Sequence, residues 1–162
     1  MMTETIQPWY LNEETPGFRT AEQVVHAIQQ RKGEDIVILD LRGRSDVADF
    51  FVLASGQSEP QIEALAKAVR QDLFGHGLKP LHIEGTNRNR WVLLDFVDVV
   101  VHLMKPDARL YYDLERLWND ADRLAVPEDY FSWPTVAERH PDLPLVKRMA
   151  GAEDADRKTE ES

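Results

Sequence analysis

The chain has 162 residues, 43% of them hydrophobic, with nine prolines, no cysteine and a formal net charge of −10. This length supports one domain with a substantial core plus extensions. The lack of cysteine excludes disulfides, thiolate metal sites and cysteine nucleophiles, and it agrees with a reducing cytoplasm. The net charge argues against general nucleic-acid binding, and against direct DNA binding in particular, because phosphate contacts need clustered Lys and Arg.

Targeting and membrane signals are missing from the sequence. No apolar run approaches the ~20 residues that cross a bilayer. The start, MMTETIQPWY, lacks the basic segment and the apolar stretch of a signal peptide. We therefore expect a cytoplasmic protein without membrane contact.

The residue pattern divides the chain into three parts. Residues 1–17 mix aromatics, prolines and a glycine without a period, which predicts an irregular arm. Residues 18–120 carry helical and strand patterns and predict one α/β domain. Residues 121–162 are rich in proline and end in an acidic stretch, so we expect an extension with a disordered tail that the core fold does not need.

The first predicted helix starts near Thr20 and Gln23, which have the spacing of a capping box, and it ends at Gly33. Its apolar stripe recurs at helical spacing and comprises Ala21, Val24, Val25 and Ile28. Two apolar runs follow, Ile36–Leu39 and Phe50–Ala54. Each is too short for a helix and unpatterned, as a strand covered on both faces would be.

The loop Ser55–Ser58 leads into a second predicted helix. Ser58 and Gln61 form another capping box, and the helix ends at Gly75 or Gly77. Its apolar stripe comprises Ile62, Leu65, Ala66, Val69 and Leu73. A short strand over Lys79–Ile83 and a loop over Gly85–Asn89 come next.

The segment Arg90–Met104 has the strongest strand character, with apolar runs at Trp91–Leu94 and Val99–Met104. A two-residue turn at Phe96 and Val97 would make these runs an antiparallel hairpin. The predicted cross-strand pairs are Asp95 with Asp98, Leu93 with Val100 and Trp91 with His102. These six side chains would share a mixed face, whereas the opposite face is wholly apolar and comprises Val92, Leu94, Val99 and Val101.

A last helix is predicted from about Ala108 to Trp118. After Pro106, one helical face carries Tyr111, Leu114, Leu117 and Trp118. The order α-β-β-α-β-β-β-α then predicts a single α/β domain with a sheet of about five strands and helices packed mainly on one face.

Two features are candidates for phosphate or metal chemistry. Ser55–Ser58 precede a helix, where free N–H groups and the dipole favour anions, but the loop lacks the spacing and lysine of a phosphate-binding loop, so a plain turn is favoured. Two acidic pairs are candidate magnesium ligands, Asp46 with Asp49 and Asp95 with Asp98. Neither has Asp-x-Asp spacing on one strand face, and the first pair more often caps a turn.

Catalytic residues are not predicted. His102 lies among valines, where a lone histidine is more often structural than basic, and the other four histidines lack ligand spacing. No serine lies in a nucleophile elbow. We therefore expect no catalytic residue, no metal and no cofactor, and a protein that is not an enzyme.

The mixed face favours a protein partner. Like charges opposite each other in a sheet repel, and they are retained more easily where a cation meets them. Trp91 beside them is the large, rigid aromatic anchor that interfaces use. The alternative interpretation is a solvated turn with Trp91 in the core.

Four segments carry a family resemblance: DIVILDL at Asp35–Leu41, ADFFVLASG at Ala48–Gly56, RWVLLDF and DVVVHLM within Arg90–Met104, and YYDLERLW at Tyr111–Trp118. Together with Glu84 and Gly85, at the position of the family's Ile-Glu-Gly, they are similar to the ribosomal silencing factor family, RsfS or Iojap. The resemblance covers about Phe18–Asp120. Val97 stands where the family usually has glycine in the hairpin turn, which leaves the predicted pairing open.

The resemblance implies a mixed-sheet α/β domain related to the nucleotidyltransferase fold, without that superfamily's catalytic carboxylates. It implies binding to the large ribosomal subunit through ribosomal protein L-fourteen, which sterically blocks subunit joining and represses translation under nutrient limitation. The expected partner-binding residues are Trp91, Leu93, Asp95, Phe96, Asp98, Val100 and His102. A nucleotidyltransferase-like enzyme or a nucleotide-binding protein is the alternative, and homodimer formation is left open.

Overall fold

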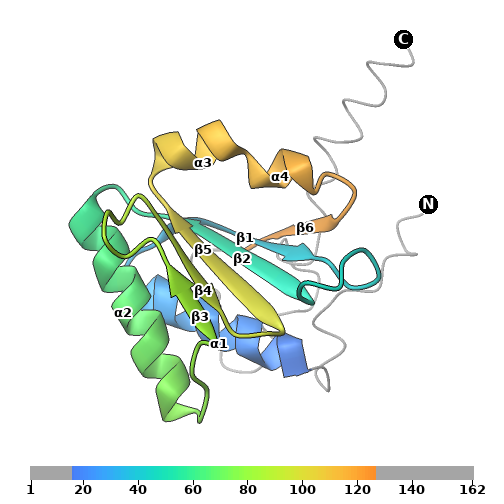
Figure 1. Cartoon of the computed structure of the whole chain (residues 1–162), viewed down its shortest axis with the longest axis horizontal. Helices are drawn as coiled ribbons and strands as arrows, with labels where there is room; N and C mark the ends of the chain where they lie inside the picture. Colours follow the sequence, from blue (N-terminus) through green and yellow to red (C-terminus); the bar gives the residue numbers. More distant parts are fainter. Residues whose placement is uncertain (1–15, 127–162) are drawn as a thin grey trace.

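The apolar runs of the sequence form the strands of one mixed sheet (Figure 1). The structure is a computed structural model, and it describes residues 16–126. The elements in chain order are α1 (Pro16–Gln30), β1 (Glu34–Asp40), β2 (Phe50–Ser55), α2 (Glu59–Gly75), β3 (His82–Glu84), β4 (Trp91–Asp95), β5 (Val99–Met104), α3 (Pro106–Tyr112), α4 (Leu114–Leu117) and β6 (Asp122–Ala125). The six strands lie in the order β3-β4-β5-β2-β1-β6. β2 and β5 are parallel, and the other neighbours are antiparallel.

The centre of the sheet is apolar on both faces. All six residues of β2 and all six of β5 are buried, as expected for strands covered on both sides. The mixed α/β fold predicted from the sequence is therefore confirmed.

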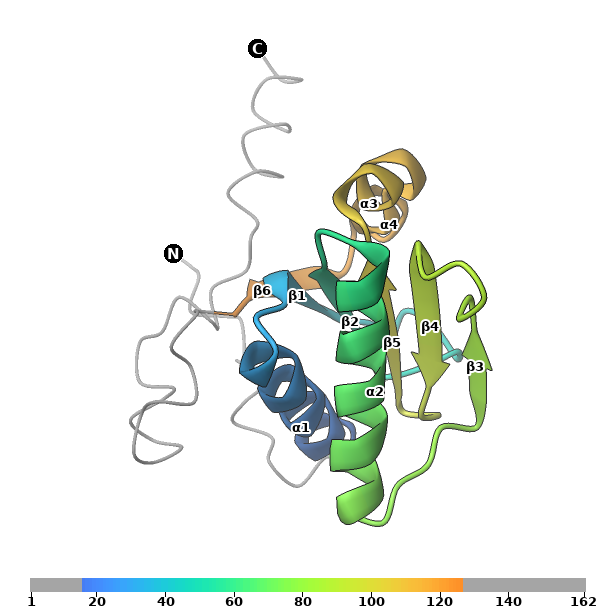
Figure 2. The same ribbon diagram turned by 90° about the vertical axis from the view of Figure 1, so that its left-hand side faces the viewer.

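Helices α1 and α2 cover one face of the sheet together (Figure 2). The buried residues of α2 are Ile62, Leu65, Ala66, Val69 and Leu73, which is the predicted stripe. Ser58 caps the helix, since its Oγ accepts a hydrogen bond from the Gln61 N–H at 3.2 Å. The alternating residues Val92, Leu94, Val99 and Val101 lie in the core beneath these helices, as predicted.

The other face has a second, smaller core, to which α4 contributes Leu114. This core lies over β1, β2 and β5, and Trp118 packs against it. β4 alternates between buried and half-buried residues, so its outer side is only partly covered. Helices therefore lie on both faces, with the longer pair on one face.

Several predicted boundaries are wrong, and one of them is the short strand predicted over Lys79–Ile83, which the structure has at His82–Glu84. α1 begins at Pro16, and Thr20 is a buried residue inside it, because the helix uses an earlier start than the capping-box spacing indicated. β6 lies beyond the predicted domain end at Asp120 and pairs with β1 over four positions, which adds a sixth strand to the expected five. The irregular arm and the remainder of the extension lie almost wholly outside the described residues.

The last predicted helix is broken. Asp113 has φ +50°, which ends α3 and separates it from α4. The break turns Tyr111 and Leu117 outward, with exposures of 80% and 70%, whereas Leu114 is buried. The single apolar face predicted for Ala108–Trp118 is therefore wrong.

Within residues 16–126, none of the helices has the length and apolar character needed to cross a bilayer.

Candidate partner-binding face

The hairpin of β4 and β5 has a register two residues away from the predicted one. Asp95 pairs with Val100, Leu93 with His102 and Trp91 with Met104. An even shift preserves the face of every side chain, because side chains alternate with a period of two. The predicted faces of the strands therefore stand, but Asp95 and Asp98 are not cross-strand partners.

The shift arises at Val97. The Asp98 N–H donates to the Phe96 carbonyl at 2.9 Å, and Val97 between them has φ +76°, the features of a tight three-residue turn. The Val97 N–H donates to Asp95 Oδ1 at 2.8 Å. Asp95 therefore supports the turn with its own side chain, in the way that short acidic residues often do.

Three side chains of β4 point away from α1 and α2 and are half-buried: Trp91, Leu93 and Asp95. We call these three residues the β4 face. Val100 and His102 share the same side of the sheet but are buried, with 4% and 3% exposure. Phe96 is 6% exposed and packs in the core beneath the helices. Direct contact with a partner is thus open to the β4 face and Asp98, which are all partly exposed.

His102 accepts a hydrogen bond from Trp91 and so helps to fix the position of the indole. The Trp91 Nε1–H donates to His102 Nδ1 at 3.1 Å, so the neutral ring carries its proton on Nε2. Nε2 is buried and has no hydrogen-bond partner within the described part of the chain. Burial lowers the pKa of His102 to about 4, which keeps the ring neutral near pH 7. His102 is therefore a structural residue, as expected.

Asp98 lies next to an acidic residue, Asp49, which directly precedes β2. The Asp98 carbonyl accepts hydrogen bonds from the N–H groups of Asp49 and Phe50 at 2.8 and 3.1 Å. Burial, with a contribution from the Asp98 charge, raises the pKa of Asp49. The like-charge pair at the hairpin tip is thus Asp49 with Asp98, and not Asp95 with Asp98.

Two tyrosines that were not among the predicted partner-binding residues lie next to Trp91 of the β4 face. The rings of Trp91 and Tyr112 have centroids 4.6 Å apart, and those of Tyr112 and Tyr111 have centroids 4.9 Å apart. The helical spacing predicted that Tyr111 lies on an apolar helical face, and it indicated no role for Tyr112. Their exposure depends on the helix break at Asp113. The sequence signal for this break was the aspartate itself, because Asp tolerates the left-handed backbone conformation.

The loop Ser55–Ser58 forms a plain strand-to-helix turn, with its polar groups used internally. The Gly56 N–H donates to the Met104 carbonyl, and the Gln57 N–H donates to Gln61 Oε1. Ser55 Oγ accepts from Arg109 at 2.9 Å. In the turn before β2, the Val47 N–H donates to Ser45 Oγ, so Ser45 caps that turn where Asp46 and Asp49 were the predicted caps. Across residues 16–126, no group of three or more His, Asp or Glu side chains is placed to hold a metal ion.

The fold and this face define an α/β domain with one strand face left partly uncovered. The model of the family described as "Ribosomal silencing factor during starvation" matches residues 13–161, and the chain belongs to this family. The predicted relationship is confirmed.

Named relatives and solved structures agree with this assignment. The ribosomal silencing factors RsfS of Halalkalibacterium halodurans and Bacillus subtilis are each 42% identical, over 60% and 59% of this chain and 83% and 80% of their own lengths. A crystal structure of a Chromobacterium violaceum protein is 35% identical with a TM-score of 0.63, and covers 65% of this chain and 88% of its own. The family name indicates a regulatory role in ribosome silencing.

Proposed function

We propose that this protein binds the large ribosomal subunit through ribosomal protein L-fourteen in the cytoplasm, blocks joining of the small subunit and so represses translation under nutrient limitation. The observation that carries this proposal is the β4 face. It is a row of one aromatic, one aliphatic and one acidic side chain on a strand that no helix fully covers. Such a combination of an aromatic anchor and a charged rim is typical of protein interfaces.

Charge supports a basic partner. Burial and the charge of Asp98 raise the pKa of Asp49, and Arg42 lowers it by less, so a further cation placed between the two carboxylates would relieve the remaining repulsion. Ribosomal proteins are generally basic. A Lys or Arg of the partner that reaches the hairpin tip would form charge-assisted hydrogen bonds there.

Blocking of subunit joining requires only the volume of the bound domain and no catalytic step. A domain of about 100 residues has a radius of gyration of roughly 13 Å, which a close-packed subunit interface cannot accommodate. A protein held at that interface therefore prevents joining by its volume alone.

The test is a joining assay with purified small and large subunits separated by sedimentation. Added protein should lower the fraction of joined ribosomes, and Leu93→Lys, which places a charge in the β4 face, should lose this effect. Glu63→Lys on the exposed side of α2 is the control and should act like the wild type. The proposal fails if the wild type leaves joining unchanged, or if both variants behave alike. Specific binding or turnover of nucleoside triphosphates with magnesium would instead support the enzyme alternative.

A further inference from the structure

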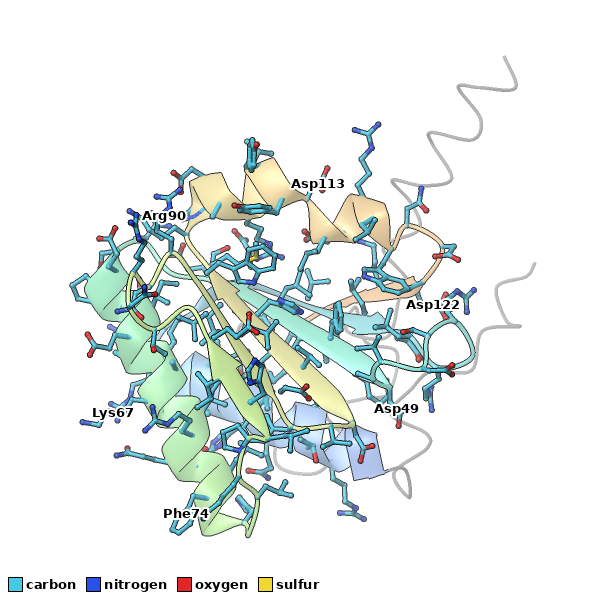
Figure 3. The ribbon with its side chains drawn as sticks, viewed as in Figure 1. Asp49, Lys67, Phe74, Arg90, Asp113 and Asp122 are labelled. Atoms are coloured by element: carbon cyan, nitrogen blue, oxygen red, sulfur yellow. The ribbon has the colours of Figure 1, made fainter. Side chains whose placement is uncertain are left out.

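A groove of about 500 Å³ lies where the β3–β4 loop faces α3, next to Trp91. Its side chains that bear on the argument are Asn87, Arg88, Arg90, Trp91, Tyr111 and Tyr112. The groove thus combines cationic, amide and aromatic groups on a chain whose net charge is −10. Figure 3 shows Arg90 at the opposite end of the sheet from Asp49, so the groove lies away from the acidic hairpin tip.

The loop above the groove has a defined backbone. The N–H groups of Arg88 and Asn89 both donate to the Gly85 carbonyl, at 3.3 and 2.9 Å. Gly85 has φ +90°, and a Cβ there would lie 2.0 Å from the Trp91 carbonyl oxygen, so glycine is required. This close approach holds the loop against the β4 backbone at Trp91, and Arg88 and Trp91 both line the groove.

The aromatic rings of the groove are available for stacking. Tyr111 is 80% exposed and Tyr112 is 52% exposed. The one polar atom of the Trp91 ring already donates to His102. Trp91 is half-buried, so it offers a ligand part of its ring surface and no hydrogen-bond donor, which suits a flat, apolar ring face.

The cations of the groove are also available. Arg88 is exposed and forms no ion pair with another residue in the range 16–126. Arg90 pairs with Asp107 at 3.0 Å, with both side chains about half exposed or more, so water and other anions compete for it. Guanidinium groups beside aromatic rings match a phosphate next to a base.

We propose that this groove binds an unpaired RNA nucleotide, with its base against Tyr111 and Tyr112 and its phosphate at Arg88. The inference rests on the proposed function, since the large subunit presents RNA as well as protein, and it adds an RNA contact to the L-fourteen contact of the β4 face. Duplex DNA does not fit, because a duplex keeps its bases stacked and the rest of the chain is acidic. An acidic peptide is the competing occupant, but its carboxylates would pair with the arginines only and would not stack on the three adjoining ring faces.

The first test titrates a labelled ten-nucleotide single-stranded RNA with the full chain at several salt concentrations and follows fluorescence anisotropy. Arg88→Glu should weaken binding and make the slope of log affinity against log salt shallower by about 0.7, the effect of one lost phosphate contact. Tyr111→Ala should weaken binding about 5- to 150-fold, the range for one lost base stack. Leu110→Ala, a change of the equally exposed neighbour outside the groove, and Arg70→Glu on α2 are the matched controls and should change little.

The second test measures the affinity of the same variants for isolated ribosomal protein L-fourteen. Arg88→Glu and Tyr111→Ala should leave it unchanged, whereas Leu93→Lys should abolish it and leave RNA binding intact. The inference is overturned if the wild type does not bind the RNA, if the controls weaken RNA binding as much as the groove variants, or if Arg88→Glu weakens L-fourteen binding as much as Leu93→Lys. If the wild type binds the RNA but does not bind L-fourteen, the proposed function is overturned, whereas the inference about the groove is supported.

Discussion

Val97 holds a backbone conformation that β-branched residues avoid. Its φ of +76° is imposed by the tight turn between Phe96 and Asp98, and the side chain is 56% exposed. Strain of this kind costs roughly 1–3 kcal/mol, and exposure means that little burial offsets it.

Val97→Gly should therefore stabilise the fold by about 1 kcal/mol, after the greater unfolded-state entropy of glycine is subtracted. Thermal unfolding followed by circular dichroism measures the change. Val47→Gly, at a similarly exposed loop position outside the left-handed region, should destabilise instead. Equal losses at both positions would show that Val97 is not strained.

His102 should make stability depend on pH below neutrality. Its folded pKa of about 4 lies below the ordinary value of 6.5, so the unfolded state binds the proton first as pH falls. Stability is therefore unaffected above about pH 6.5 and is lost between 6.5 and 4, by about 2 kcal/mol at pH 4.5.

Urea unfolding at pH 7.5 and 4.5 measures this loss, and His102→Leu provides the comparison. The variant should lose less stability over the interval than the wild type, by about the same 2 kcal/mol. An identical loss in both proteins would mean that carboxylates, and not His102, carry the acid sensitivity.

At the scale of elements, the sequence predicted those whose signal is local. The stripe of α2 and the alternation in β4 depend on periodic burial, which the residues themselves display. β6 has only four residues and forms because the edge of β1 is available to pair with it, a tertiary cause that no local pattern reveals. The break at Asp113 was missed because the residues around it also fit a continuous helical period.

β6 gives a direct test at this scale. A chain ended after Asp120 should lose on the order of 3 kcal/mol, because four paired positions on β1 would become an exposed edge. A chain ended after Val126 keeps β6 and should melt as the full chain does. Equal melting of both truncated chains would show that the domain ends at Asp120, as the sequence predicts, and that β6 adds no stability.

Arg109 connects four elements and should be equally important to the fold. Its guanidinium donates to the Asp35 carbonyl, Ser55 Oγ and Glu115, and it is 11% exposed. Arg109→Ala should cost about 3 kcal/mol, because it leaves the partly buried Glu115 carboxylate without its partner. Arg116→Ala, at an exposed position in α4, is the control in the same melting experiment and should be close to neutral. Similar small effects of both changes would contradict this role.

At the scale of the whole molecule, the exposed side of β4 joins two regions of opposite character. The aromatic and cationic groove, which includes Arg90, lies at one end, and Asp49, the acidic neighbour of Asp98, lies at the other (Figure 3). The sequence predicted the face of Trp91, Leu93 and Asp95 through alternation, but it assigned Asp98 the wrong acidic neighbour. Asp49 directly precedes β2, and its position beside Asp98 follows from the parallel pairing of β2 and β5, which begins with Phe50 opposite Val99.

The proposed function requires that the β4 face and the hairpin tip bind a basic ribosomal protein. The most direct measurement is calorimetric titration of the chain with isolated ribosomal protein L-fourteen, for the wild type, Asp98→Lys and Glu63→Lys. Asp98→Lys should weaken binding about 30-fold or more, since losing one side of a buried charge pair costs ~2 kcal/mol or more. It should leave the melting temperature unchanged or higher, because it relieves the repulsion with Asp49. Glu63→Lys, on the exposed side of α2, should bind like the wild type. Equal weakening by both reversals, or undiminished binding by Asp98→Lys, would contradict binding of the partner at the hairpin tip.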